Sequence, residues 1–111
     1  MFKSASVTAL TNVPVTGVTN LGLAFADTSG TPGNATNNNP SGRAAFAAAA
    51  ATCVITNSLV TTASKVHVQL EGGGDATLTN LLRVTIANGS FTAVGNAAAT
   101  AATPFSFLVV N

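Results

Sequence analysis

The chain has 111 residues, 6% of them charged, and a formal net charge of +1. A chain of this length forms one domain, and its near-zero net charge excludes the basic surface on which nucleic-acid binding depends. A hydrophobic fraction of 47% also argues against intrinsic disorder, which requires low hydrophobicity. Ala, Thr and Asn replace the missing charges, so we predict a neutral, easily desolvated surface that packs against other protein, including copies of itself.

Residues 1–26 are predicted to form an extended N-terminal arm with edge strands. Pro14 confines any strand in this arm to an edge or a bulge. Leu21, Leu23 and Phe25 alternate with other residues, as in a strand with one buried face. The apolar runs are short and interrupted by Thr and Asn, so we expect neither a secretory signal nor contact with a membrane.

Residues 27–42 are predicted to form a long loop or linker. Nearly every residue from Asp27 to Gly42 is a turn former, mostly Gly, Pro, Asn, Ser or Thr. Loops of this length are unusual inside compact domains and tend to be exposed, functional or mobile.

Residues 43–111 are predicted to form an antiparallel β-sandwich or small barrel of about six to seven short strands. The clearest strand is 65–71, in which Val66, Val68 and Leu70 share one face. The polar residues Lys65, His67, Gln69 and Glu71 share the other face.

The next predicted strand spans 77–86, with one apolar residue on one face and four on the other. Leu81 is expected on one face, and the opposite face is expected to hold Leu78, Leu82, Val84 and Ile86. Asn88-Gly89 then signals a two-residue hairpin leading into a strand over 90–94.

The last predicted strand is 105–110, with Phe105, Phe107 and Val109 on one face. Earlier short strands are expected over 43–47 and 53–56. The Ala-rich runs 44–51 and 97–102 have helical propensity, but both are short. We therefore favour extended or loop structure for them, because strands and turns alternate regularly around both runs.

Residues that could support chemistry are sparse, so we expect no enzyme activity, no cofactor and no metal site. His67 is the only His and Cys53 the only Cys, which excludes an internal disulfide and a His/Cys metal cluster. Glu71 and Asp75 flank a Gly-rich turn, which fits a solvated hairpin tip better than a loose cation site. Arg43 is expected to form hydrogen bonds across subunits or to backbone carbonyls. Ordinary placement on the surface is the alternative.

Several strings in residues 41–111 together resemble modules of tailed-bacteriophage virion proteins. They are Ser41-Gly42-Arg43, 54–61, 75–79, 89–92, 95–103 and 105–111. The modules are β-rich trimers found on head and tail fibres and in small capsid decoration (cement) proteins. About 40 residues precede the module, too few for a long fibre stalk, which favours a decoration protein.

The resemblance implies a homotrimer on the outer capsid surface of the virion. There it would bind the major capsid protein and stabilise contacts between capsid subunits. We expect the trimer interface to contain Phe105, Phe107, Leu108 and Val110. We expect the capsid-contacting arm to use Val7, Leu10, Val13, Val15, Val18 and Leu21. The alternative is a trimeric head- or tail-fibre module that binds a host-surface glycan or receptor.

Overall fold

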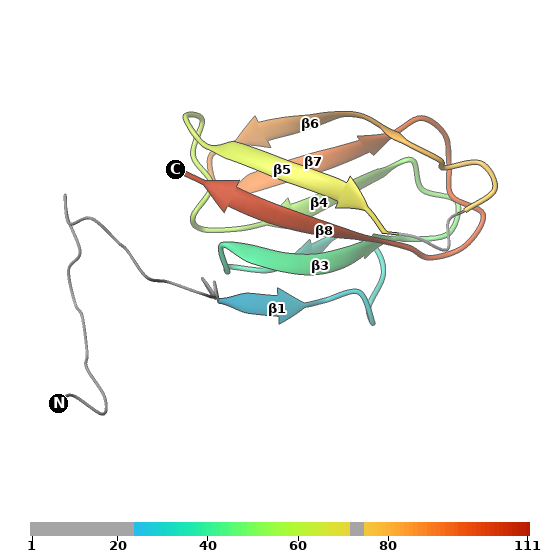
Figure 1. Ribbon diagram of the computed structural model, residues 1–111, viewed down its shortest axis with the longest axis horizontal. Coiled ribbons are helices and arrows are strands. Elements are labelled where there is room, and N and C mark those ends of the chain that lie inside the picture. The colour runs from blue at the N-terminus through green and yellow to red at the C-terminus, as the bar shows by residue number, and fades with distance from the viewer. Residues whose placement is uncertain (1–23, 72–74) are drawn as a thin grey trace, which may run out of the picture.

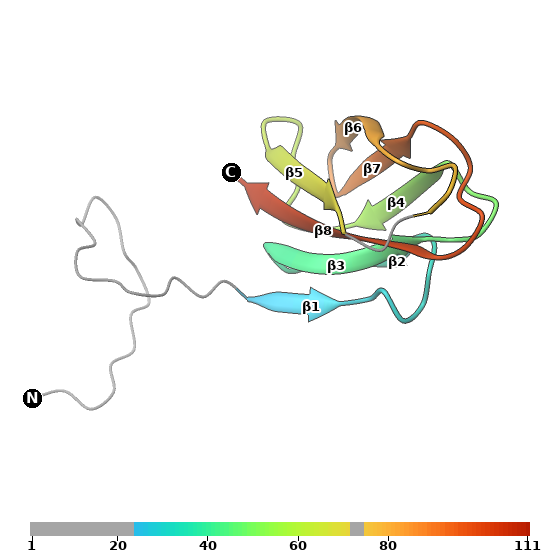
Figure 2. The same ribbon diagram turned by 45° about the vertical axis from the view of Figure 1, so that its right-hand side comes forward.

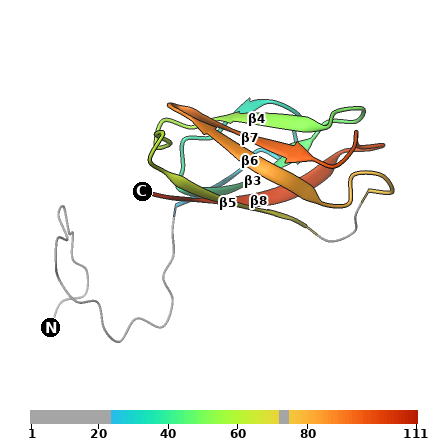
Figure 3. The same ribbon diagram turned by 90° about the horizontal axis from the view of Figure 1, so that it is seen from above.

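The computed structural model describes residues 24–71 and 75–111 and arranges them in eight β-strands. The strands are β1 (Phe25–Asp27), β2 (Ala35–Thr36), β3 (Ser41–Phe46), β4 (Thr52–Thr56), β5 (Lys65–Leu70), β6 (Leu81–Ala87), β7 (Ser90–Gly95) and β8 (Thr103–Val110). Sheet A has the order β1-β3-β8-β5 and sheet B the order β2-β4-β7-β6. The two sheets stack as the layers of a sandwich (Figures 1 and 3). The all-β prediction is confirmed, and no helix forms in these residues.

The core lies between the sheets and is made mainly by the inward-facing side chains of the strands. Phe91 of sheet B packs on Phe107 of sheet A with ring centroids 5.1 Å apart. Phe46 packs on Phe105 at 5.3 Å. Such tilted aromatic pairs add to the free energy gained by burying apolar area. The smaller core residues include Ala44, Cys53, Ile55, Val60, Leu78, Ala93, Ala99 and Val109.

Strand β5 and the 88–89 hairpin confirm the sequence predictions. Along β5, exposed and half-buried residues alternate from Lys65 to Leu70. Ala87 pairs with Ser90 across the two-residue turn, and Gly89 has a φ of 81°. That conformation is disfavoured for residues with a Cβ, which explains the Gly. The Ala-rich segments 47–51 and 97–102 form connections between strands.

The predicted faces of the 77–86 strand are wrong at two leucines. Leu81 packs against the core, whereas Leu82 is 61% exposed. The register shifts between Leu81 and Arg83, so Leu82 is an extra residue that reverses the alternation. A β-bulge of this kind cannot be read from periodicity alone.

The predicted 27–42 loop is partly built into the sheets. Its boundaries fall inside β1 and β3, and β2 forms within it. Two pairings, β1 with β3 and β2 with β4, are parallel, whereas the sequence predicts antiparallel connections.

Asparagine side chains attach this segment to both sheets. Asn34 Oδ1 accepts a hydrogen bond from the Val54 N–H at 2.8 Å. The Asn37 amide donates to the Ala26 carbonyl at 3.0 Å. These bonds satisfy backbone groups at the sheet edges, which explains why so many turn-forming residues are held in place.

Candidate interaction faces

The outer face of sheet A carries most of the charge in the described part of the chain. Six charged residues fall within 24–71 and 75–111, and four of them lie on this face or at its end. The four are Asp27, Arg43, Lys65 and Glu71. This arrangement matches the polar strand face predicted around Lys65 and His67, and extends it to β1 and β3.

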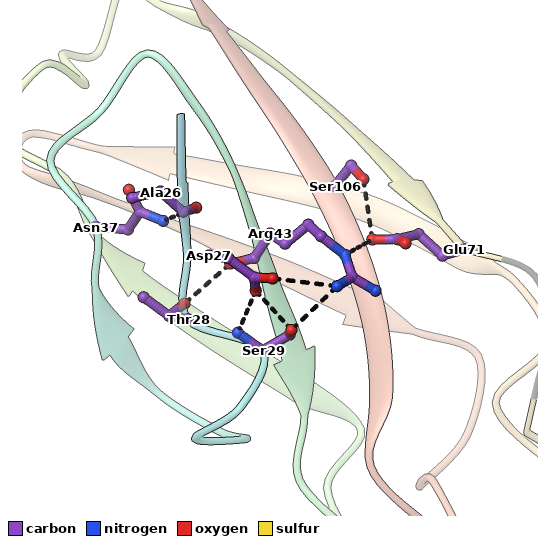
Figure 4. A network of polar contacts seen from close by, with 8 residues as sticks. All are labelled: Ala26, Asp27, Thr28, Ser29, Asn37, Arg43, Glu71 and Ser106. Carbon is purple, nitrogen blue, oxygen red and sulfur yellow. Dashed lines mark hydrogen bonds and ion pairs between the residues drawn. The ribbon is translucent and has the colours of Figure 1, made fainter. Parts of the chain in front are cut away.

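Arg43 lies between two carboxylates at the centre of this charged face (Figure 4). Its Nε donates to Glu71 Oε2 at 2.6 Å, and its Nη1 donates to Asp27 Oδ2 at 3.1 Å. Ser106 Oγ donates to the same Glu71 oxygen at 3.0 Å. Four segments of sheet A are therefore joined by one network: β1, β3, β8 and the residue after β5.

Hydrogen bonds to the charged forms keep both carboxylates ionised. The Ser29 hydroxyl and backbone N–H, followed by Arg43, lower the pKa of Asp27. Arg43, followed by Ser106, lowers the pKa of Glu71. Carboxylates with lowered pKa values are poor proton donors near neutral pH, so the network is suited to holding strands together rather than to acid–base chemistry.

A shallow hollow lies next to this network between β5 and β8. It has a volume of about 520 Å³ and is lined by His67, Val68, Gln69, Ser106, Phe107 and Leu108. The polar lining groups can exchange hydrogen bonds with hydroxyl-bearing ligands. Within the described residues, no cluster of three or more His, Cys, Asp or Glu side chains could hold a metal ion.

The outer face of sheet B is almost neutral. Across β4, β7 and β6, its rows are Thr52–Val94–Arg83, Val54–Thr92–Thr85 and Thr56–Ser90–Ala87. Arg83, at one corner, is the only charge in these three rows. Threonine and valine have few rotamers to lose on burial, so ordering this face in an interface costs little conformational entropy.

Asp75 anchors two loops at the end of the sandwich where β8 begins. Its Oδ2 accepts hydrogen bonds from the Thr77 N–H, the Thr77 hydroxyl and the Leu78 N–H. Its Oδ1 accepts bonds from the Thr100 hydroxyl and N–H and from the Ala101 N–H. Six donors occupy the carboxylate, and Glu71 is turned toward Arg43. The two acids therefore do not form the loose cation site considered from sequence.

Cys53 is a free cysteine buried in the core. Burial raises the pKa of its thiol to about 11. A thiol that stays protonated at neutral pH is a poor nucleophile, so Cys53 serves as a small packing residue.

The predicted trimer-interface residues divide between the two faces of β8. Phe105 is 0% exposed and Phe107 3% exposed, and both lie inside this chain's own core, which excludes them as contact residues on the folded surface. The prediction is wrong for these two because β8 is covered by sheet B of the same chain. Leu108 and Val110 point to the outer face of sheet A. The predicted arm residues Val7 to Leu21 lie outside the described residues.

Among the described residues, no helix is long and apolar enough to cross a membrane. Comparison with protein-family models, with curated proteins and with solved structures found no match to this chain.

Proposed function

We propose that this protein is a structural virion protein that decorates the outer surface of a bacteriophage head. In this proposal it binds as a homotrimer to the major capsid protein and strengthens contacts between capsid subunits. Two arguments support it: the resemblance of residues 41–111 to phage decoration and fibre modules, and the chemistry of the outer faces.

The neutral outer face of sheet B is the observation that carries the proposal. A protein that binds a large assembly must give up the hydration of its contact surface. Charged side chains oppose that step strongly, whereas Thr, Val and Ala oppose it weakly. The charged outer face of sheet A would then remain in solvent, whereas the neutral outer face of sheet B would be buried against the capsid.

The size of this face favours binding by several copies together. Three strands about 4.8 Å apart and five residues at about 3.3 Å each give roughly 250 Å² of projected area. A stable interface buries about 800 Å² per partner. Three linked copies approach that size, and their joint binding gains from the high effective concentration of each remaining copy.

Stabilisation of the shell follows from mass action. A ligand that binds only the assembled shell stabilises it by RT ln(1 + [L]/Kd) at every site. Because a head offers many equivalent sites, the stabilisation free energies of the sites sum to a large total even when the affinity at each site is modest. No catalytic step is required in this proposal.

Binding to phage heads that lack this protein tests the proposal. Thr92→Arg adds a charge at the centre of the sheet B face and should weaken binding strongly. Gln69→Arg adds the same charge to the exposed face of sheet A and serves as the matched control. Equal binding by both variants would contradict the assigned face. Virions without the protein should also release DNA at a lower temperature than complete virions.

A trimeric fibre module that binds a host-surface glycan is the second candidate. The hollow beside His67 and Gln69 favours it, because these side chains can bond sugar hydroxyls. His67→Ala combined with Gln69→Ala should then reduce phage adsorption to host cells. Normal adsorption by phage lacking the protein would exclude this candidate and leave decoration unaffected.

A further inference from the structure

Strand β5 is an edge strand whose outer backbone groups can be identified. It is the last strand in the order β1-β3-β8-β5, and its only pairing among the described strands is with β8. The opposite layer ends in β6, which lies beside β5 without joining its ladder (Figure 2). A row of unpaired N–H and C=O groups on such an edge is a template for another strand.

Two hydrogen bonds fix which β5 groups face outward. The Glu71 N–H donates to the Pro104 carbonyl, and hydrogen-bonded pairs recur at every second residue of an antiparallel ladder. Lys65, His67 and Gln69 therefore direct their backbone groups toward β8. The Val109 N–H confirms this alternation, because it donates to the Pro40 carbonyl on the β3 side of β8. The backbone groups of Val66, Val68 and Leu70 consequently point away from the sheet.

The side chains of residues 65–71 are self-complementary in an antiparallel arrangement. With Val68 on a two-fold axis, Lys65 lies opposite Glu71 of the second copy, and His67 lies opposite Gln69. Val66 then lies opposite Leu70, so the three outward residues on each copy form hydrogen-bonded pairs. Opposite charges in directly facing positions stabilise an antiparallel pair, whereas like charges destabilise it.

The side chains needed for this pairing are accessible. Lys65, His67 and Gln69 are exposed, and Lys65 forms no ion pair with any described residue. Both contacts of Glu71 use Oε2, so Oε1 can accept from Lys65 of the second copy. The flexible lysine side chain has the length to reach it.

We propose that β5 pairs edge to edge with β5 of a second copy, forming one eight-stranded sheet across a two-fold axis. The interface is isologous, because the same strand is used by both molecules. Sheet B of each copy then lies on the same side of the extended sheet. This contact does not depend on the virion role, and in a trimer it would link one trimer to the next.

Amide hydrogen exchange measured by NMR at low and high protein concentration tests the pairing directly. The amides of Val66, Val68 and Leu70 should exchange rapidly when dilute and become protected as concentration rises. Those of Lys65, His67 and Gln69 should be protected throughout, because β8 already binds them. Outward amides that stay unprotected at every concentration would overturn the proposal. Protection that does not vary with concentration would overturn it too, since it would mean that the same chain covers the edge.

Charge reversal provides a second, independent test by sedimentation. Lys65→Glu places two like-charged pairs in the interface and should weaken self-association by about ten-fold or more. Glu71→Lys should do the same, and an equal mixture of the two variants should associate more tightly than either alone. Arg83→Glu, which lies on sheet B, is the matched control and should have no effect. A mixture no tighter than its components would contradict the register.

Discussion

Replacing Phe105 with Ala should destabilise the fold of each chain rather than separate its copies. The ring is fully buried and packs against Phe46 at 5.3 Å. Removal of a buried Phe side chain costs about 3–5 kcal/mol through lost burial and the cavity left behind. Domains of this size are stable by about 5–15 kcal/mol, so the variant should lose a large share of its stability.

Urea and thermal unfolding followed by far-UV circular dichroism measure this loss, because the chain has no Trp or Tyr for fluorescence. The Tm should fall by about 12 °C or more. Leu108→Ala, on the outer face of β8, is the matched control and should cost under about 1 kcal/mol. A loss of stability in Phe105→Ala no larger than that of the control would contradict this prediction. The prediction is also refuted if raising the protein concentration restores stability, which would place Phe105 between copies.

Three further predictions concern the backbone, the acids and the thiol. Gly42→Ala would place a Cβ 2.5 Å from a carbonyl oxygen of β1, so β1 should detach and become sensitive to limited proteolysis. Gly30→Ala, which meets nothing within 4 Å, should behave as wild type. The Thr100 hydroxyl and the backbone N–H groups of Leu78 and Thr77 lower the pKa of Asp75 below its ordinary value of 3.8. Its stabilising contribution is therefore complete above that value and lost as pH falls through the folded-state pKa. Asp75→Asn should flatten the fall of Tm between pH 5 and pH 2, two values chosen to bracket the unfolded-state pKa of about 3.9. Cys53, whose pKa burial raises to about 11, should resist alkylation at neutral pH and react only in denaturant, as mass spectrometry would show.

The strands with strict alternation were predictable from the sequence. Val66, Val68 and Leu70 specify the inner face of β5, and Asn88-Gly89 specifies the β6–β7 hairpin by local chemistry. Both signals act over a few residues, so they need no knowledge of the tertiary fold. The connections built from Ala were also predictable, because their lengths and surroundings outweighed helical propensity.

The errors arose where distant contacts decide the structure. Leu82 is exposed because a bulge adds one residue to β6, and periodicity carries no sign of it. Asn34 and Asn37 look like loop residues, yet their amides bond to strands far along the chain. Sequence composition does not reveal such partners.

The interaction faces were only partly predictable. The polar face of β5 follows from alternation, but Arg43 joins it through Asp27 and Glu71, which are 16 and 28 residues away. The alternating apolar residues of β8 can be read from the sequence, but the sheet that covers them cannot. Phe105 is covered by the chain's own second sheet, whereas Leu108 and Val110 face outward.

The number of copies in purified virions tests the central claim most directly. Quantitative mass spectrometry against the major capsid protein gives this ratio without assuming a structure. The decoration account predicts hundreds of copies per virion, in fixed proportion to the capsid protein. A ratio of a few copies to a few dozen would indicate a fibre, and absence from the virion would contradict the account.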